Sequence, residues 1–142
     1  MSVDTIPFSP VGLDHVVIRA GDAAALVEFY GRVLGLPVER HLERIGLYQL
    51  RAGRTLIDIV DAAGEIGRGG GAAPGAEGRN MDHYCIRIEP WDEAAIRGHL
   101  ETHGVDAGPA ERRYGAEGDG PSIYLSDPEG NVVELKGPPD NT

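Results

Sequence analysis

The fold is decided by a stretch near the N-terminus, Leu13–Arg19 (LDHVVIR), whose pattern recurs 68 positions later as Met81–Arg87 (MDHYCIR). Both stretches are rich in β-branched or aromatic residues, so each predicts a short β-strand. The two share Asp, His, Ile and Arg at matching positions. A repeat of this kind predicts two copies of one supersecondary unit in the chain.

The elements that follow each strand come in the same order. A helical spacing of apolar residues comes first and ends at a glycine, Gly35 in one copy and Gly104 in the other. A less regular strand and then two strand-like runs around a turn complete each copy. The expected helices are 23–34 and 91–103, the weaker strands 38–44 and 107–113, and the hairpins 47–60 and 123–136. We therefore predict an α+β fold built from two tandem βαβββ modules.

A length of 142 residues is typical of one domain, so we expect 1–142 to fold as a unit. Within it the modules lie at about 11–62 and 80–137, joined by the glycine-rich segment 63–79. That segment has no apolar periodicity. Its composition predicts a flexible linker or a mobile loop.

Charge and apolar content limit the classes of partner. The net charge of −10 would repel a nucleic-acid backbone. The apolar runs are too short to cross a bilayer, and the first residues lack the features of a secretion signal. We therefore expect a cytoplasmic protein with neither nucleic acid nor membrane as partner. The single cysteine, Cys85, lies in an apolar run and is expected to be a small buried side chain.

Four polar residues stand among apolar neighbours on the predicted strands: His15, Asp58, His83 and Glu134. Burying an ionised carboxylate costs several kcal/mol unless it is paired, hydrogen-bonded or bound to a metal. If the modules pack face to face, His15 would meet His83, and Asp58 would meet Glu134, near the local axis. Two imidazoles with one or two carboxylates suit Fe, Mn, Ni, Co or Zn rather than calcium. The pattern thus predicts a divalent metal site; the alternative is four hydrogen-bonded or solvated side chains.

The last hairpin adds an aromatic residue to this group. Its SDPEGN turn, 126–131, predicts a type I turn with Gly130 in the left-handed region. Counting back along both strands places Tyr124 opposite Glu134. A hydroxyl there can orient a substrate or donate a hydrogen bond to a developing oxyanion, and the alternative is a cross-strand packing pair. Tyr48 precedes Asp58 by the same ten residues, which favours the same arrangement in the first module.

Three further residues precede the last hairpin: Arg112, Arg113 and Tyr114. Arginine side chains near a metal site are suited to recognising an anionic substrate. The alternative is a solvated, charged loop.

Three stretches together resemble the vicinal oxygen chelate superfamily: LDHV at 13–16, EFYGRVLGLP at 28–37 and IYLSDPEGNVVE at 123–134. Its members include glyoxalase I, extradiol ring-cleaving dioxygenases, fosfomycin-resistance thiol transferases and bleomycin-resistance proteins. The resemblance covers nearly the whole chain. It implies a cupped mixed β-sheet made by paired βαβββ modules around a metal site, commonly in a homodimer.

The resemblance also implies roles for single residues. His15, His83 and Glu134 match the metal ligands, and Asp58 matches the place of a fourth ligand that is often Glu. The reading we favour is a glyoxalase-like lyase or isomerase acting on a small substrate, in which Glu134 or Asp58 moves a proton on a chelated enediolate. The alternatives are an Fe(II) ring-cleaving dioxygenase with Asp58 unbound, and a metal-free protein that binds a drug or another small molecule.

Overall fold

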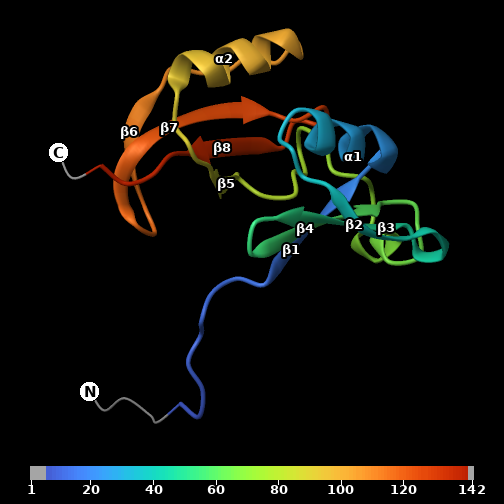
Figure 1. The fold of residues 1–142 in the computed structure, drawn as a ribbon. Coiled ribbons are helices and arrows are strands. Elements are labelled where there is room, and N and C mark those ends of the chain that lie inside the picture. Colours follow the sequence, from blue (N-terminus) through green and yellow to red (C-terminus); the bar gives the residue numbers. More distant parts are fainter. Residues whose placement is uncertain (1–5, 141–142) are drawn as a thin grey trace.

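The structure is a computed structural model that describes residues 6–140 (Figure 1). The elements are β1 (His15–Ala20), α1 (Ala23–Arg32), β2 (Val38–Leu42), η1 (Glu43–Ile45), β3 (Leu47–Ala52), β4 (Thr55–Asp61), η2 (Gly67–Gly70), β5 (Tyr84–Arg87), α2 (Glu93–Thr102), β6 (Glu111–Gly115), β7 (Gly118–Ser126) and β8 (Val132–Lys136). The order strand, helix and three strands thus occurs twice, as the repeat predicts.

The strands form two mixed sheets of the same topology. Their orders are β1-β4-β3-β2 and β5-β8-β7-β6. In each sheet the first strand of the module pairs in parallel with the last, and the remaining pairs are antiparallel. The prediction of an α+β fold with two repeated modules is therefore confirmed. The first strands, β1 and β5, both lie at sheet edges.

Each helix begins at an aspartate that caps it. The side chain of Asp22 accepts a hydrogen bond from Ala25 N at 3.1 Å, and Asp92 does the same for Ala95 N at 3.1 Å. Such caps satisfy backbone N–H groups that have no partner within the helix. Within residues 6–140, neither the length nor the apolar character of any helix suffices for crossing a membrane.

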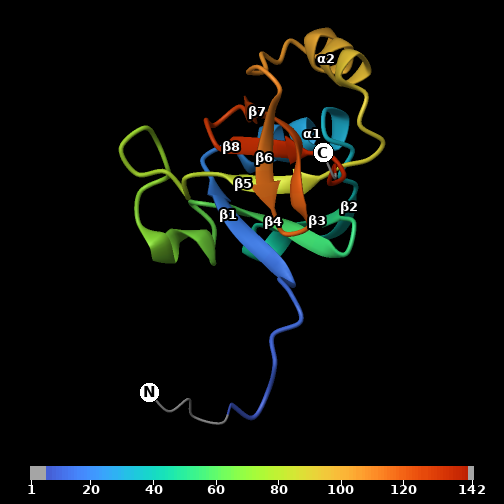
Figure 2. The same ribbon diagram turned by 90° about the vertical axis from the view of Figure 1, so that its left-hand side faces the viewer.

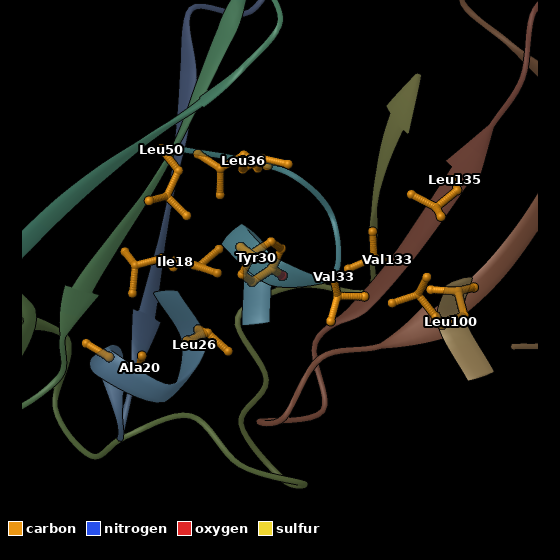
Figure 3. Packing of buried hydrophobic residues seen from close by; sticks show 14 of the residues in the cluster. Ile18, Ala20, Leu26, Tyr30, Val33, Leu36, Leu50, Leu100, Val133 and Leu135 are labelled. Atoms are coloured by element: carbon orange, nitrogen blue, oxygen red, sulfur yellow. The ribbon is translucent and has the colours of Figure 1, made fainter. Parts of the chain in front are cut away.

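One hydrophobic core joins the two modules (Figure 3). Helix α1 supplies its centre, because Leu26 and Tyr30 are fully buried between the first sheet and the second module. Alternate residues of the strands, such as Ile57 in β4 and Val133 in β8, face this core. The other face of each sheet points away from this core. We call it the inner face, because the candidate ligands lie on it. The candidate ligands Asp58 and Glu134 follow Ile57 and Val133 and so lie on the inner faces.

The SDPEGN turn fastens the second module to the first. Asp127 is buried, and its Oδ2 accepts hydrogen bonds from Tyr30 Oη and Asn131 Nδ2, each at 2.8 Å. Its Oδ1 accepts from the backbone N–H of Glu129 and of Asn131, each at 2.9 Å. Gly130 has a φ of 83°, as the predicted turn requires. The SDPEGN turn therefore holds the second module against the first.

A second set of bonds extends this joint to β1. The Glu129 carboxylate accepts from Gly21 N at 2.8 Å, and Asn80 binds both the N–H and the carbonyl of Arg19. Asn80 Nδ2 also donates to Asn131 Oδ1 at 3.0 Å. These contacts fix the angle at which the two sheets meet.

The glycine-rich segment is held against β1 instead of hanging free, which differs from the expectation based on composition. Arg19 donates to the carbonyls of Gly67 at 2.8 Å, Gly71 at 2.5 Å and Ala72 at 3.0 Å. A Cβ at Gly67 would lie 2.0 Å from a backbone oxygen of Asp61. Glycine is therefore needed there for close packing. Figure 2 shows this segment folded into a loop beside β1, whereas residues 6–14 run away from the sheets.

Candidate metal centre

The first sheet brings His15 and Asp58 together on its inner face. The parallel pairing of β1 with β4 sets Val17 beside Asp58, and His15 lies two residues before Val17 on the same face. Asp58 is 3% exposed; its Oδ2 accepts from Gln49 Nε2 at 3.2 Å, and its Oδ1 has no hydrogen-bond partner among the described residues. We call His15 with Asp58 the first half-site.

The second sheet brings His83 and Glu134 together in the same way. His83 Nε2 lies 3.4 Å from Glu134 Oε1, and Glu134 is buried. Tyr124 is opposite Glu134 in the β7–β8 register, as predicted, and its ring meets the His83 ring edge-on at 5.3 Å. Burial, followed by the charge of Glu134 and a hydrogen bond to it, raises the pKa of Tyr124 above its usual value. Its hydroxyl therefore stays protonated and can donate. We call His83 with Glu134 the second half-site.

An aspartate precedes each histidine and binds its ring. His15 Nδ1 lies 2.7 Å from Asp14 Oδ2, and His83 Nδ1 lies 2.6 Å from Asp82 Oδ2. The hydrogen bond that His15 donates to Asp14 is the main cause that raises the pKa of His15, with a smaller contribution from the charge of Asp58. A carboxylate on Nδ1 orients the ring and leaves Nε2 as the metal-binding nitrogen. The predictions from sequence do not include this role, although the repeated Asp-His pair is its signal.

The two half-sites do not meet within one chain. Across residues 6–140, no group of three or more His, Cys, Asp and Glu side chains is placed to hold a metal ion. The convergence of both pairs on one local axis, which the repeat suggests, is therefore absent between the modules of a single copy. Each half-site instead lies at a sheet edge, next to β1 or β5.

The donor atoms nevertheless fit a divalent cation. Each half-site offers one imidazole nitrogen and one buried carboxylate, which is the mixed N and O set that suits transition metals. The unpartnered Oδ1 of Asp58 is the clearest sign, because a buried carboxylate oxygen without a donor is costly. A cation would satisfy it.

The position of Tyr48 differs from the one that its spacing suggests. In the register of β3 with β4, Asp58 pairs with Gln49, while Tyr48 pairs with Ile59 and lies on the core side. The cause is the length of the turns. The β3–β4 ladder closes at the pair Ala52 and Thr55, whereas the β7–β8 ladder stops before a longer loop. The repeated spacing of ten residues therefore gives no support for Asp58 as a counterpart of Glu134.

Cys85 also differs from its expectation, since the structure leaves it exposed on the inner face. It pairs with Glu134 in the β5–β8 register. Partial desolvation and the Glu134 charge raise the pKa of its thiol to about 11. The thiol is thus protonated at neutral pH and is a poor nucleophile.

Comparisons with known proteins agree with this architecture. The chain is 32% identical over 126 residues to the Glyoxalase domain-containing protein RDO1 of Mycosarcoma maydis, a match that covers 87% of this chain and 66% of RDO1. The integron cassette protein VCH_CASS1 from the mobile metagenome of V. cholerae has a TM-score of 0.74 at 24% identity, with 93% of this chain and 98% of that chain covered. Lactoylglutathione lyase from Agrobacterium tumefaciens has a TM-score of 0.63 at 21% identity, with 90% and 94% covered. These two likenesses show the fold.

The family is shown by a match over most of the chain. The family model described as Glyoxalase/Bleomycin resistance protein/Dioxygenase superfamily matches residues 12–135, which include both half-sites. That description names glyoxalases and dioxygenases, which are enzymes, together with bleomycin resistance proteins. The chain therefore belongs to the Glyoxalase/Bleomycin resistance protein/Dioxygenase superfamily, the vicinal oxygen chelate superfamily that its sequence resembles.

Proposed function

We propose that the protein is a metal-dependent lyase or isomerase of the glyoxalase type, acting on a small substrate with two neighbouring oxygens. Its centre forms between two copies of the chain, from His15 and Asp58 of one copy and His83 and Glu134 of the other. The observation that carries the proposal is the pair of matching half-sites, each with a carboxylate-oriented histidine and a buried carboxylate.

The sheet edges support a site between copies. Each half-site flanks an edge strand that pairs on one side only. Beside His15, the apolar Leu13 and Val17 are 77% and 50% exposed. Exposed edges of this kind are normally covered, and a two-fold dimer is the commonest way to cover them. An edge-to-edge contact of β1 with β5 of a second copy would bring the half-sites together.

Each residue of the composite centre then has its own role in the reaction. When bound, a divalent cation would supply a Lewis acid that stabilises negative charge developing on the two substrate oxygens. His15 and His83 would hold the cation through Nε2. Glu134 and Asp58 would hold it through carboxylate oxygens, and one of these carboxylates would take a proton from one substrate carbon and return it to the adjacent carbon. Tyr124 donates a hydrogen bond to the oxygen that gains charge.

The direct test is a titration of the metal-free protein with Fe(II), Mn(II), Ni(II), Co(II) and Zn(II), followed by assay. The probe is the adduct of a 2-oxoaldehyde with a thiol, in deuterated water. We expect one metal per composite site, and product that carries solvent deuterium at the carbon receiving the proton. Absence of metal binding by the folded protein would leave the small-molecule-binding alternative.

A ring-cleaving dioxygenase is the second candidate, and Asp58 favours it in one respect. Its side chain is one methylene shorter than Glu, and Gln49 already binds Oδ2. Three ligands suffice in an Fe(II) facial triad, and Asp58 would then only support them. Oxygen consumption with a catechol in the presence of Fe(II) would transfer the assignment to this class.

Asp58→Asn separates the two candidates. We expect metal affinity and turnover to fall by more than about 100-fold, because the variant removes a direct ligand and its charge. Gln49→Ala is the matched control, because it removes the hydrogen bond to Asp58 Oδ2 and leaves the carboxylate in place. Its loss of metal affinity should stay within the range of about 10- to 100-fold typical of outer contacts. Calorimetric titration of both variants checks this. An equal loss in the two would assign Asp58 a supporting role.

A further inference from the structure

Beyond the half-site, the inner face of the second sheet holds a buried lysine. Lys136 follows Glu134 by two residues on β8 and is 6% exposed. Its Nζ donates to the carbonyl of Gly118 at 3.0 Å, and it has no ion pair with any carboxylate among residues 6–140. A buried ammonium group with one neutral acceptor is costly, so an anionic partner would stabilise it.

Two glycines make room for this side chain. A Cβ at Gly115 would lie 2.9 Å from Lys136 Cε, and a Cβ at Gly120 would lie 3.1 Å from Lys136 Nζ. The lysine therefore lies across the β6–β7 hairpin, in a slot that any larger residue at these positions would narrow. The slot shows that the position of the ammonium group is fixed by the fold.

Two arginines flank the lysine. Arg87 pairs with Lys136 in the β5–β8 register, and its Nε donates to Glu117 at 2.7 Å. Arg113 in β6 donates to Glu111 at 2.9 Å. Arg87 also forms an ion pair with Glu89 at 3.6 Å. Both arginines therefore have carboxylate partners, and Lys136 is the one cation of the three that lacks an ion pair among residues 6–140.

Arg113 links this cationic region to the half-site. Its Nη1 donates to Ser122 Oγ at 2.7 Å, and its Cζ lies 4.5 Å from the centre of the Tyr124 ring. Ser122 pairs with Lys136, and Tyr124 pairs with Glu134, in the β7–β8 register. In β8, Lys136 therefore lies two residues, about 7 Å along the strand, from Glu134, the carboxylate that would hold the metal.

We propose that Lys136 and Arg113 bind a carboxylate group of the substrate, while its two neighbouring oxygens lie at the composite centre. This rests on the proposed function and names its substrate class: small 2-hydroxy or 2-oxo carbonyl compounds that also carry a carboxylate group. Of the residues 112–114, only Arg113 faces the inner side, because strand side chains alternate. Arg112 lies on the other face, with ion pairs to Asp119 and Asp140.

The first test needs no metal. Succinate is titrated into the metal-free dimer by calorimetry or NMR, with Lys136→Gln, Arg113→Gln and, as the matched control, Arg112→Gln. We expect the first two variants to weaken succinate binding by about 10- to 100-fold, the range for hydrogen bonds to charged groups, and the control to leave it unchanged. Failure of the wild-type protein to bind succinate, or equal binding by Lys136→Gln, would overturn the proposal.

The second test asks whether one ligand binds to the anion subsite and to the metal centre at the same time. Metal-loaded protein is titrated with lactate and with malate, which share the chelating hydroxy acid and differ by the second carboxylate. Lys136→Gln should weaken the binding of malate by about 10-fold or more and leave the binding of lactate unchanged. Equal effects on both ligands would overturn the link. Succinate binding without any metal binding would instead refute the proposed function and keep the anion subsite.

Folding of the lysine variant is checked separately. If Lys136 is an uncompensated buried charge, Lys136→Met is expected to unfold at a temperature equal to or above that of the wild type. A marked loss of stability would mean that the lysine is structural, and would count against the proposal.

Discussion

Glu134→Gln should lower metal affinity by about 1,000-fold and abolish turnover with it. Removing one charged partner of a buried pair costs about 3–5 kcal/mol, and 4.1 kcal/mol corresponds to about 1,000-fold. Glu134 is 6% exposed and lies 3.4 Å from His83 Nε2, so its carboxylate is largely shielded from solvent. Calorimetric titration with each metal measures the loss.

Glu117→Gln is the control for Glu134→Gln, because it makes the same change at the end of the same sheet. Glu117 pairs with Arg87 and its side chain is 52% exposed. An exposed pair contributes about 1 kcal/mol or less, so metal affinity should change little. If Glu134→Gln kept near-normal metal affinity, Glu134 would not be a ligand of the metal centre.

Asp127→Ala should lower the free energy of unfolding by about 3–5 kcal/mol. Its two oxygens accept four hydrogen bonds, and each buried donor left without an acceptor costs about 1–3 kcal/mol. Because the bond from Tyr30 crosses between the modules, the loss also loosens their joint. Denaturant unfolding of the metal-free protein, at fixed protein concentration, measures the difference.

Glu28→Ala is the control for this variant. Glu28 pairs with Arg32 one turn along α1, and both side chains are more than half exposed. Its removal should change the unfolding free energy by no more than about 0.5 kcal/mol. If Asp127→Ala matched this small change, the turn would not be the joint that its hydrogen bonds indicate.

The sequence predicts the elements of each module well because local signals coincide. Asp22 and Gly35 bracket α1, and the SDPEGN turn sets the register that places Tyr124 opposite Glu134. Tyr48 shows where such reasoning fails. A count of ten residues ignores the length of the turn, and one residue of register moves a side chain to the other face of the sheet.

The relation between the half-sites could not be predicted at all. Alternating apolar residues determine which face of each sheet is buried, but every copy of the chain carries the same His15 and His83. The pattern therefore does not choose between a site within one chain and a site between copies. That choice depends on the angle between the sheets, which the long-range bonds of Asp127, Glu129 and Asn80 set.

The central claim, a metal centre shared between two copies, is tested most directly by mixing two inactive variants. His15→Ala and His83→Ala should each fail to bind metal tightly as homodimers. After refolding together, each mixed dimer has one site built from the intact half of both chains, so about a quarter of the wild-type metal capacity should return. If both histidines of a site came from one chain, mixing the variants would restore no metal binding. Tight metal binding that stays absent after mixing, with mixed dimers demonstrated, would contradict the account.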